Sequence, residues 1–299
     1  MRLRLLMLAA GLALAPCAQA QGELGARWWV SSGETKLGHN AQILDPTLGN
    51  PTSVLVYGNL DANTLELFGR LGFGERWFLK GVAGFGDINR GSFDDEDFNV
   101  GQAKFSDTNS SVTQGRVSYG VIDFGRQWPR SEGGLRFGVF AGYSQWTENY
   151  DAYGATDFLG GIGGDIPHDV GVISNKVTWH ALRAGVAADF VSGRMRFSVD
   201  AALIPYAKFR NEDSHHLRAD LGPVPNIVDE GDGWGGQLDV ELTYEIARRT
   251  EIGIGWRYWY LEARDGTTDF VNFNFAEEAP LVDFYTKRGG LLISLRRTW

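Results

Sequence analysis

The chain has little cysteine: a single residue, Cys17, which falls in an N-terminal segment that we expect to be removed. A disulfide needs two cysteines and a thiol nucleophile needs one, so the mature chain is expected to have neither. This scarcity excludes disulfide-stapled domains and cysteine-dependent enzymes.

Long apolar runs and positive charge are also scarce. Beyond the N-terminal segment, no stretch has the ~18 uninterrupted apolar residues that a membrane helix requires. The net charge is -9, and loss of Arg2 and Arg4 would take it to about -11. A chain this acidic is not expected to bind nucleic acid, but it is compatible with cationic ligands. Its 40 glycines and 13% aromatic residues favour strands over helices.

The N-terminal segment has the parts of an export signal. Arg2 and Arg4 precede the apolar run 5–15, and the small residues at 18–20 form a cleavage site. We therefore predict a signal peptide at residues 1–20 and a single mature domain at residues 21–299. A lipidated Cys17 is the alternative, which Pro16 and the cleavage site just beyond it disfavour.

Apolar and polar residues alternate along the mature chain. In the segment 237–244, Leu238, Val240, Leu242 and Tyr244 share one face, and polar residues occupy the other. The segments 64–73, 135–141 and 251–260 alternate in the same way. This period of two is typical of strands with one face in lipid and the other toward a polar lumen, although soluble sandwiches alternate too.

The connections between these segments alternate in length. Tight turns are expected near residues 74–75, 128–134, 192–193 and 247–250. Long polar stretches separate them near residues 36–53, 90–112, 150–172, 216–233 and 265–281. Nine connections join ten strands, and bacterial outer-membrane barrels have an even strand number, short periplasmic turns and long extracellular loops. We therefore predict an all-β fold, a ten-stranded antiparallel transmembrane β-barrel of the outer membrane with its long loops on the extracellular side.

Tryptophans mark a possible contact with the membrane interface. Candidates for the aromatic girdles of such a barrel are Trp28, Trp29, Trp77, Trp128, Trp256, Trp259 and Trp299. Any of them could instead pack within the wall.

Two polar clusters fall at the expected extracellular strand ends. Residues two apart on a strand share a face, so Asp95 pairs with Asp97, and Asp213 pairs with His215. A carboxylate beside an imidazole orients it and stabilises its protonated form, and a second acidic pair can hold a water for the imidazole to deprotonate. The alternatives are solvated loops or, for Asp95 to Asn99, a calcium loop, although Val100 stands where that loop requires glycine. No zinc spacing is present, so we predict no metal site.

Strict alternation poses a difficulty for the second cluster. Continued from Phe197 and Leu203, it would direct Asp213 and His215 toward lipid. Pro205 cannot donate to a strand ladder, so we predict a bulge between Leu203 and Asn211 that turns the following side chains inward.

These residues resemble the omptin family, ten-stranded outer-membrane endopeptidases with an active site at the extracellular mouth. The resemblance rests on three segments, Asp95-Glu96-Asp97-Phe98, Asp213-Ser214-His215 and Ala141-Gly142-Tyr143, and extends over about residues 32–216. It implies that His215 is the general base, that Asp213 orients it, and that Asp95 and Asp97 position the attacking water. It also implies hydrolysis of extracellular peptides or proteins without a covalent intermediate or a cofactor.

The chain departs from this family at two sites. Leu37 and Asn211 stand at substrate-pocket positions where the family has acidic residues, so a weaker preference for Arg or Lys is expected. Tyr143 and, less closely, Lys176 match an outer-wall lipopolysaccharide site. Neutral residues stand at 145 and 147, where charged ligands are usual, which argues against dependence on lipopolysaccharide.

Two other functions remain open from the sequence. An inactive omptin-like barrel could act as an adhesin or peptide-binding surface protein, given the changed pocket. A small channel is the second alternative, although inward side chains such as Glu66, Arg70, Asp239 and Glu241 would fill a narrow ten-stranded lumen.

Overall fold

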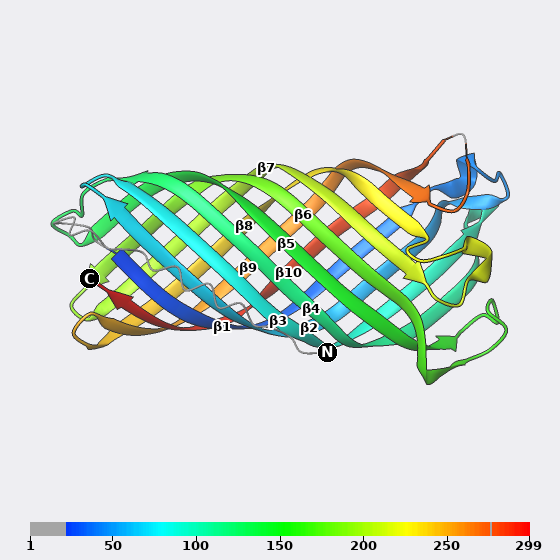
Figure 1. Cartoon of the computed structure of the whole chain (residues 1–299), viewed down its shortest axis with the longest axis horizontal. Coiled ribbons are helices and arrows are strands. Elements are labelled where there is room, and N and C mark those ends of the chain that lie inside the picture. Colours follow the sequence, from blue (N-terminus) through cyan, green and yellow to red (C-terminus); the bar gives the residue numbers. More distant parts are fainter. Residues whose placement is uncertain (1–21, 276) are drawn as a thin grey trace, which may run out of the picture.

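The computed structural model describes residues 22–275 and 277–299, so the expected signal peptide lies outside the described residues. The described residues form ten antiparallel strands, each paired with its sequence neighbours, and β10 pairs back to β1 to close one barrel (Figure 1). The strands are β1 (Gly22–His39), β2 (Leu48–Phe73), β3 (Trp77–Asn99), β4 (Ala103–Gln127), β5 (Leu135–Asp157), β6 (Ile166–Ser192), β7 (Met195–His215), β8 (Ile227–Ala247), β9 (Thr250–Phe270) and β10 (Ala279–Thr298). Over this part of the chain, no helix is both long and apolar enough to cross a membrane. The predicted ten-stranded all-β fold is confirmed.

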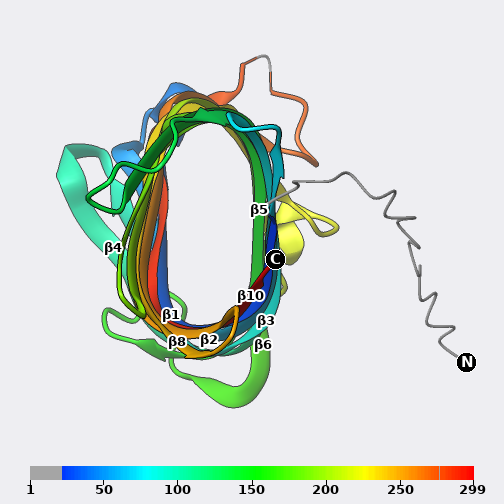
Figure 2. The same cartoon turned by 90° about the vertical axis from the view of Figure 1, so that its left-hand side faces the viewer.

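The two ends of the barrel differ. Both ends of the barrel domain and four tight turns lie at one end, which we call the short-turn end; it is on the left in Figure 1 and faces the viewer in Figure 2. The turns fall at residues 74–76, 128–134, 193–194 and 248–249, as predicted. Seen from this end, the barrel is an oval (Figure 2). The five other connections lie at the opposite end, which we call the far end.

The predicted long loops at the far end are mostly strand. The stretch 90–112, for example, is a paired hairpin in which β3 and β4 are joined by only three residues, Val100–Gln102. Pairing satisfies backbone N–H and C=O groups above a membrane as well as within it, so polar residues do not by themselves end a strand. The strands have 18 to 27 residues, whereas about 9–11 residues cross a bilayer. Each strand therefore extends well beyond the length needed for crossing.

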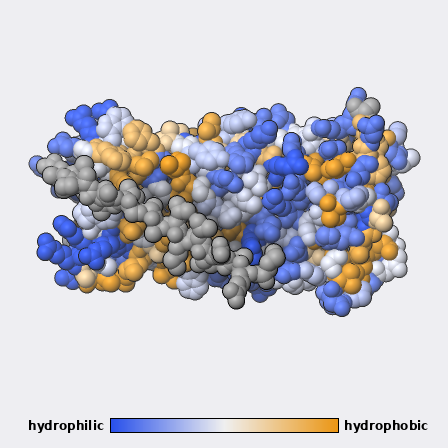
Figure 3. All heavy atoms as spheres, viewed as in Figure 1, coloured by the Kyte–Doolittle hydropathy of each residue, from blue (hydrophilic) through white to orange (hydrophobic). Residues whose placement is uncertain are grey.

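An apolar belt surrounds the half of the barrel near the short-turn end. Outward side chains there are large and exposed, such as Leu67 on β2 and Phe197 and Leu203 on β7. On the face shown in Figure 3, apolar atoms lie in this half, hydrophilic atoms are dense further along the wall, and further apolar patches lie among hydrophilic atoms at the far end. After Tyr206, the outward residues of β7 are polar, beginning with the charged Lys208, Arg210 and Glu212. The far third of the strands therefore lies outside the belt.

The tryptophans divide between the two faces of the wall. Trp28, Trp77, Trp128, Trp256 and Trp299 are 45–49% exposed on the outside, consistent with girdle positions. Trp29 and Trp259 are buried in the lumen, so the prediction that they belong to a girdle was wrong. They face inward because successive strand residues alternate between faces, which places Trp29 opposite to Trp28. Their ring centroids lie 5.5 Å apart, and Tyr119 and Trp146 complete an aromatic layer across the lumen.

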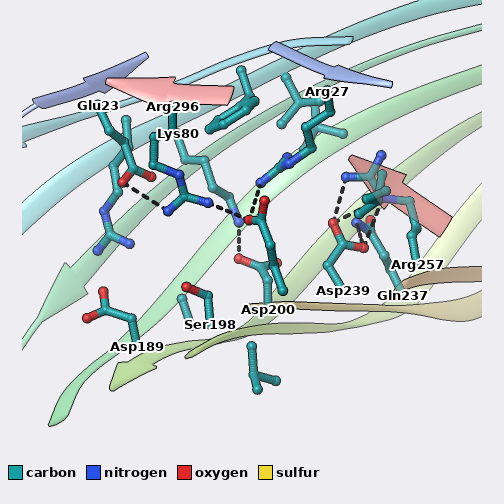
Figure 4. A pocket seen from close by; sticks show the side chains of 18 of the residues that line it. Glu23, Arg27, Lys80, Asp189, Ser198, Asp200, Gln237, Asp239, Arg257 and Arg296 are labelled. Carbon is teal, nitrogen blue, oxygen red and sulfur yellow. Dashed lines mark hydrogen bonds and ion pairs between the residues drawn. The ribbon is translucent and has the colours of Figure 1, made fainter. Parts of the chain in front are cut away.

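Charged side chains fill the lumen on the short-turn side of this layer. Arg257 lies 2.6 Å from Asp239 (Figure 4). Arg257 also contacts Glu66, and Glu241 pairs with Arg296. The inward orientation predicted for Glu66, Asp239 and Glu241 is confirmed, and Arg70 lines the same interior. Packed rings and paired charges across the lumen disfavour an open channel.

A bulge in β7 reorients the strand. The pairing of β7 with β6 shifts between Leu203 and Tyr206, and its pairing with β8 shifts between Ile204 and Ala207. Leu203 is 73% exposed, whereas Ala207 and Asn211 are fully buried, so the inward phase changes across Pro205. The predicted irregularity is confirmed, and it turns the end of β7 toward the lumen.

Candidate active site at the far end

The end of β7 brings Asp213 and His215 to the inner face of the far mouth. The side chain of Asp213 is 2% exposed, and its Oδ2 lies 3.3 Å from Nε2 of His215. The hydroxyl of Tyr57 on β2 donates a 3.2 Å hydrogen bond to the other carboxylate oxygen. Asn226 fixes the backbone of His215, because it accepts from its N–H at 3.0 Å and donates to its C=O at 3.2 Å. Asp213 is therefore held by a side chain of β2, and His215 is held by the residue that precedes β8.

Asp95 and Asp97 lie near the end of β3 at the same mouth. Ser53 on β2 is paired in register with Asp97, and its hydroxyl donates to Asp95 Oδ1 at 3.3 Å. Both aspartates are half-buried. Among the described residues, no group of three or more His, Cys, Asp or Glu side chains is arranged to hold a metal ion.

The charges of the two pairs act on one another. Burial raises the pKa of Asp95 to about 7, the like charge of Asp97 adds to this, and His215 opposes it. Burial also raises the pKa of Asp97, and His215 again acts in the opposite direction. Ser53, which donates to Asp95, and Tyr57, which donates to Asp213, lie four residues apart on the same face of β2, so the two pairs border one stretch of that strand. The structure therefore gathers the four predicted residues around one mouth.

The environment of His215 favours its protonated form. Burial alone would lower its pKa, but the carboxylate of Asp213, with a smaller contribution from Asp95, raises it above the usual value of 6.5. The 3.3 Å contact leaves Nε2 without an aligned hydrogen bond. Contacts of this kind are often long before substrate binds. Asp213 can therefore orient the ring and stabilise it as a cation.

The electrostatic coupling gives a prediction for Asp95→Asn. Removal of the Asp95 charge is expected to lower the pKa of His215, because that charge stabilises the imidazolium. The measurement is an NMR titration of the histidine ring protons, which is tractable in a chain with only 5 histidines. Asp94→Asn is the matched control, since Asp94 lies on the opposite face of β3 and accepts from Asn109. An unchanged His215 titration in Asp95→Asn would show that the two pairs do not share a mouth.

The two expected substrate-pocket residues are fully buried beneath this mouth. Leu37 on β1 lies beside Leu55 and Phe284 in the registers of the neighbouring strands. The amide of Asn211 accepts from Asn175 at 2.8 Å and donates to Asp229 on β8 at 2.9 Å. Burial raises the pKa of Asp229 to about 6. A carboxyl group therefore lies directly beside Asn211 on the neighbouring strand.

The sequence did not indicate several residues of the site. Tyr57, Ser53 and Asp229 come from other strands, and no local motif marks them. His39, interpreted from sequence as an isolated residue, lies in the same mouth: burial lowers its pKa to about 4, and the nearby His215 acts in the same direction. Only pairing of distant strands assembles this set.

The two lipopolysaccharide candidates lie on the outer wall and are well separated. The hydroxyl of Tyr143 lies 2.5 Å from Nδ1 of His180, and Lys176 forms a 3.0 Å ion pair with Glu212. Tyr143 is in register with Leu182, six residues from Lys176 on β6, which corresponds to about 20 Å along the strand. The structure does not bring these two residues together.

Comparison with known proteins places the fold. No protein-family model matches the sequence, and no curated protein matches it. The crystal structure of the outer membrane protease OmpT from Escherichia coli matches with a TM-score of 0.75 at 13% identity, over 93% of this chain and 97% of that chain. The toluene transporter TodX from P. putida (TM-score 0.31, 6% identity, 95% of this chain and 91% of that chain) and OprG from Pseudomonas aeruginosa (TM-score 0.32, 9% identity, 92% and 95%) superpose poorly. The chain therefore has the fold of an outer-membrane β-barrel, and it is similar in structure to an outer-membrane protease over nearly its whole length.

Proposed function

We propose that this protein is an omptin-like endopeptidase of the outer membrane, with its far mouth open to the extracellular side. The observation that carries the proposal is the placement of Asp213 and His215 in one mouth with Asp95 and Asp97, with charge coupling between the pairs. The similarity in fold to a solved protease supports it. Outward apolar residues of β7 end at Tyr206, and His215 lies nine residues later, about 30 Å along the strand. The site would therefore stand clear of the bilayer, within reach of peptides in water.

The proposed reaction is hydrolysis by an activated water. Nε2 of His215 faces Asp213, so Nδ1 is free to take a proton from a water as that water attacks the peptide carbonyl. Asp213 stabilises the imidazolium that forms. Collapse of the tetrahedral intermediate breaks the C–N bond, and the imidazolium returns its proton to the leaving amine. No bond to the protein forms at any step.

Asp95 and Asp97 would hold that water opposite His215. Because burial raises the pKa of both groups, the pair can retain a proton near neutral pH and offer the water both a donor and an acceptor. Ser53 holds Asp95 in place. This arrangement orients the lone pair of the water toward the carbonyl carbon.

We expect the enzyme to prefer Arg or Lys in its substrates less strongly than an enzyme whose substrate pocket is acidic. Leu37 and Asn211 carry no charge, and the carboxyl group of Asp229, beside Asn211, already accepts hydrogen bonds from Asn211 and Thr268. Lipopolysaccharide dependence is not part of the proposal, because Tyr143 and Lys176 are far apart and each has a protein partner.

The function is tested by incubating refolded protein with a mixed peptide library and identifying new peptide termini by mass spectrometry. Cleavage at internal bonds by folded protein is expected. Heat-dependent mobility on a gel reports whether the barrel has folded. Binding of cationic peptides without any new termini would instead favour a non-enzymatic, peptide-binding protein. That alternative rests on the uncharged residues Leu37 and Asn211 at the substrate-pocket positions.

A further inference from the structure

The mouth at the short-turn end has an excess of arginines. A cavity of about 290 Å³ opens there, and Arg70, Arg130, Arg136, Arg196 and Arg249 line it with a single acid, Glu23. A space of this size can hold a small hydrated anion. The cavity lies at the opposite end of the barrel from the candidate active site.

The acids near this cavity do not balance the arginines. Asp189 is shared by two guanidinium groups, those of Arg130 and Arg136. Arg196 contacts Glu251 at 2.9 Å and Glu23 at 3.5 Å, and Glu23 is also approached by Arg296 at 3.5 Å. Each carboxylate thus serves more than one cation, apart from Glu251.

Arg70 differs from Arg130, Arg136 and Arg196 because it has no acidic partner. Its guanidinium donates to the neutral amide oxygen of Gln127 at 2.6 Å and lies 3.8 Å over the ring of Phe78. Within residues 22–275 and 277–299, no carboxylate lies within ion-pair distance of it. Arg70 also lines the deeper lumen cavity, so it stands where the two spaces meet.

The deeper cavity provides the contrast. It measures about 90 Å³, and other cations that line it meet acids directly. Arg257 lies 2.6 Å from Asp239 (Figure 4), Lys80 lies 3.1 Å from Asp123, and Arg27 lies 2.7 Å from Glu66. In these pairs an acid within the lumen neutralises the charge of each cation. The charge of Arg70 at the open mouth has no acidic partner of this kind.

We propose that the cavity at the short-turn end binds a compact oxyanion, a soluble phosphate group, between Arg70 and the neighbouring Arg136 and Arg196. The planar guanidinium forks match the oxygens of a phosphate, and such charge-assisted hydrogen bonds are strong. The barrel wall separates the cavity from lipid headgroups outside, so the phosphate comes from the aqueous side.

The test is calorimetric titration of refolded protein with inorganic phosphate in neutral detergent and low-chloride buffer. Wild type is expected to show saturable one-site binding that weakens as salt is added. Arg70→Gln should weaken it at least tenfold, and Arg70→Lys should weaken it less because the charge remains. Arg126→Gln should leave it unchanged, since Arg126 is exposed on the outer wall beside Trp77 and Trp128.

Gel mobility without heating confirms that each variant is folded before titration. Absence of saturable binding in folded wild type would overturn the proposal, as would equal binding by Arg70→Gln. Displacement of phosphate by micelles that contain phosphatidylglycerol would also overturn it, because the site would then belong to lipid.

Discussion

His215→Ala is expected to lower kcat/KM for peptide hydrolysis by roughly 10²–10⁴-fold, the usual contribution of a general base. In the variant the imidazole proposed to take the proton of the attacking water is gone, and burial favours the protonated form of Asp95 and Asp97. His39 remains in the mouth, but burial lowers its pKa to about 4, so it is a weak base. The backbone of residue 215 keeps its bonds to Asn226, so the barrel should fold normally. The measurement is steady-state cleavage of one fluorogenic peptide chosen from the library hits.

The adjacent histidine supplies the matched control. His216 is exposed, and its Nε2 lies 2.8 Å from the hydroxyl of Ser174, away from Asp213. His216→Ala should therefore retain activity within about twofold, as is usual for an exposed substitution. Full activity in folded His215→Ala would remove the proposed base.

Asp213→Asn is expected to reduce kcat by roughly 10²-fold or more and to move the acid limb of the pH profile to lower pH. His215 acts as a base only when neutral, so activity in wild type rises as pH increases through the raised pKa of His215. The Asp213 charge is the main factor that raises this pKa, and its removal lowers the pH at which the ring becomes neutral. The two effects have different causes. The value of kcat falls because the His215 imidazolium loses the carboxylate that stabilises it. The acid limb of the pH profile shifts because His215 loses its proton at lower pH.

Glu212→Gln controls for loss of negative charge near the mouth. Glu212 lies on the opposite face of β7 and is paired with Lys176 on the outside of the barrel. Its profile should match that of wild type. An Asp213→Asn variant with a lower kcat but an unmoved acid limb would show that Asp213 does not act through His215.

The fold was largely predictable because alternation directly reflects a wall with two different faces. Alternating segments such as Leu238 to Tyr244 indicated strands, and the nine connections between segments predicted ten strands with both chain ends on the short-turn side. Length of the strands was not predictable in the same way. Polar residues such as those of 90–112 indicated a loop. In the closed barrel each strand is hydrogen-bonded to a neighbour on both sides, and this pairing allows strands to continue into water.

The candidate site was half predictable. Asp95, Asp97, Asp213 and His215 form short local patterns, and Pro205 signalled the bulge that turns the second pair inward. Tyr57, Ser53, His39 and Asp229 reach the mouth only through strand pairing and the curvature of the barrel, which leave no local signal. The same limit explains Trp29 and Trp259, whose inward orientation depends on the phase of each strand.

The central claim, that both pairs act on one water, is tested most directly by a double-mutant cycle on kcat/KM with Asp95→Asn, His215→Ala and the double variant. If Asp95 holds the water that His215 deprotonates, Asp95 should contribute little to kcat/KM once His215 is absent. The double variant is then expected to be about as slow as His215→Ala alone. Losses that multiply across the two substitutions would contradict the account, because they would show that the two pairs act independently.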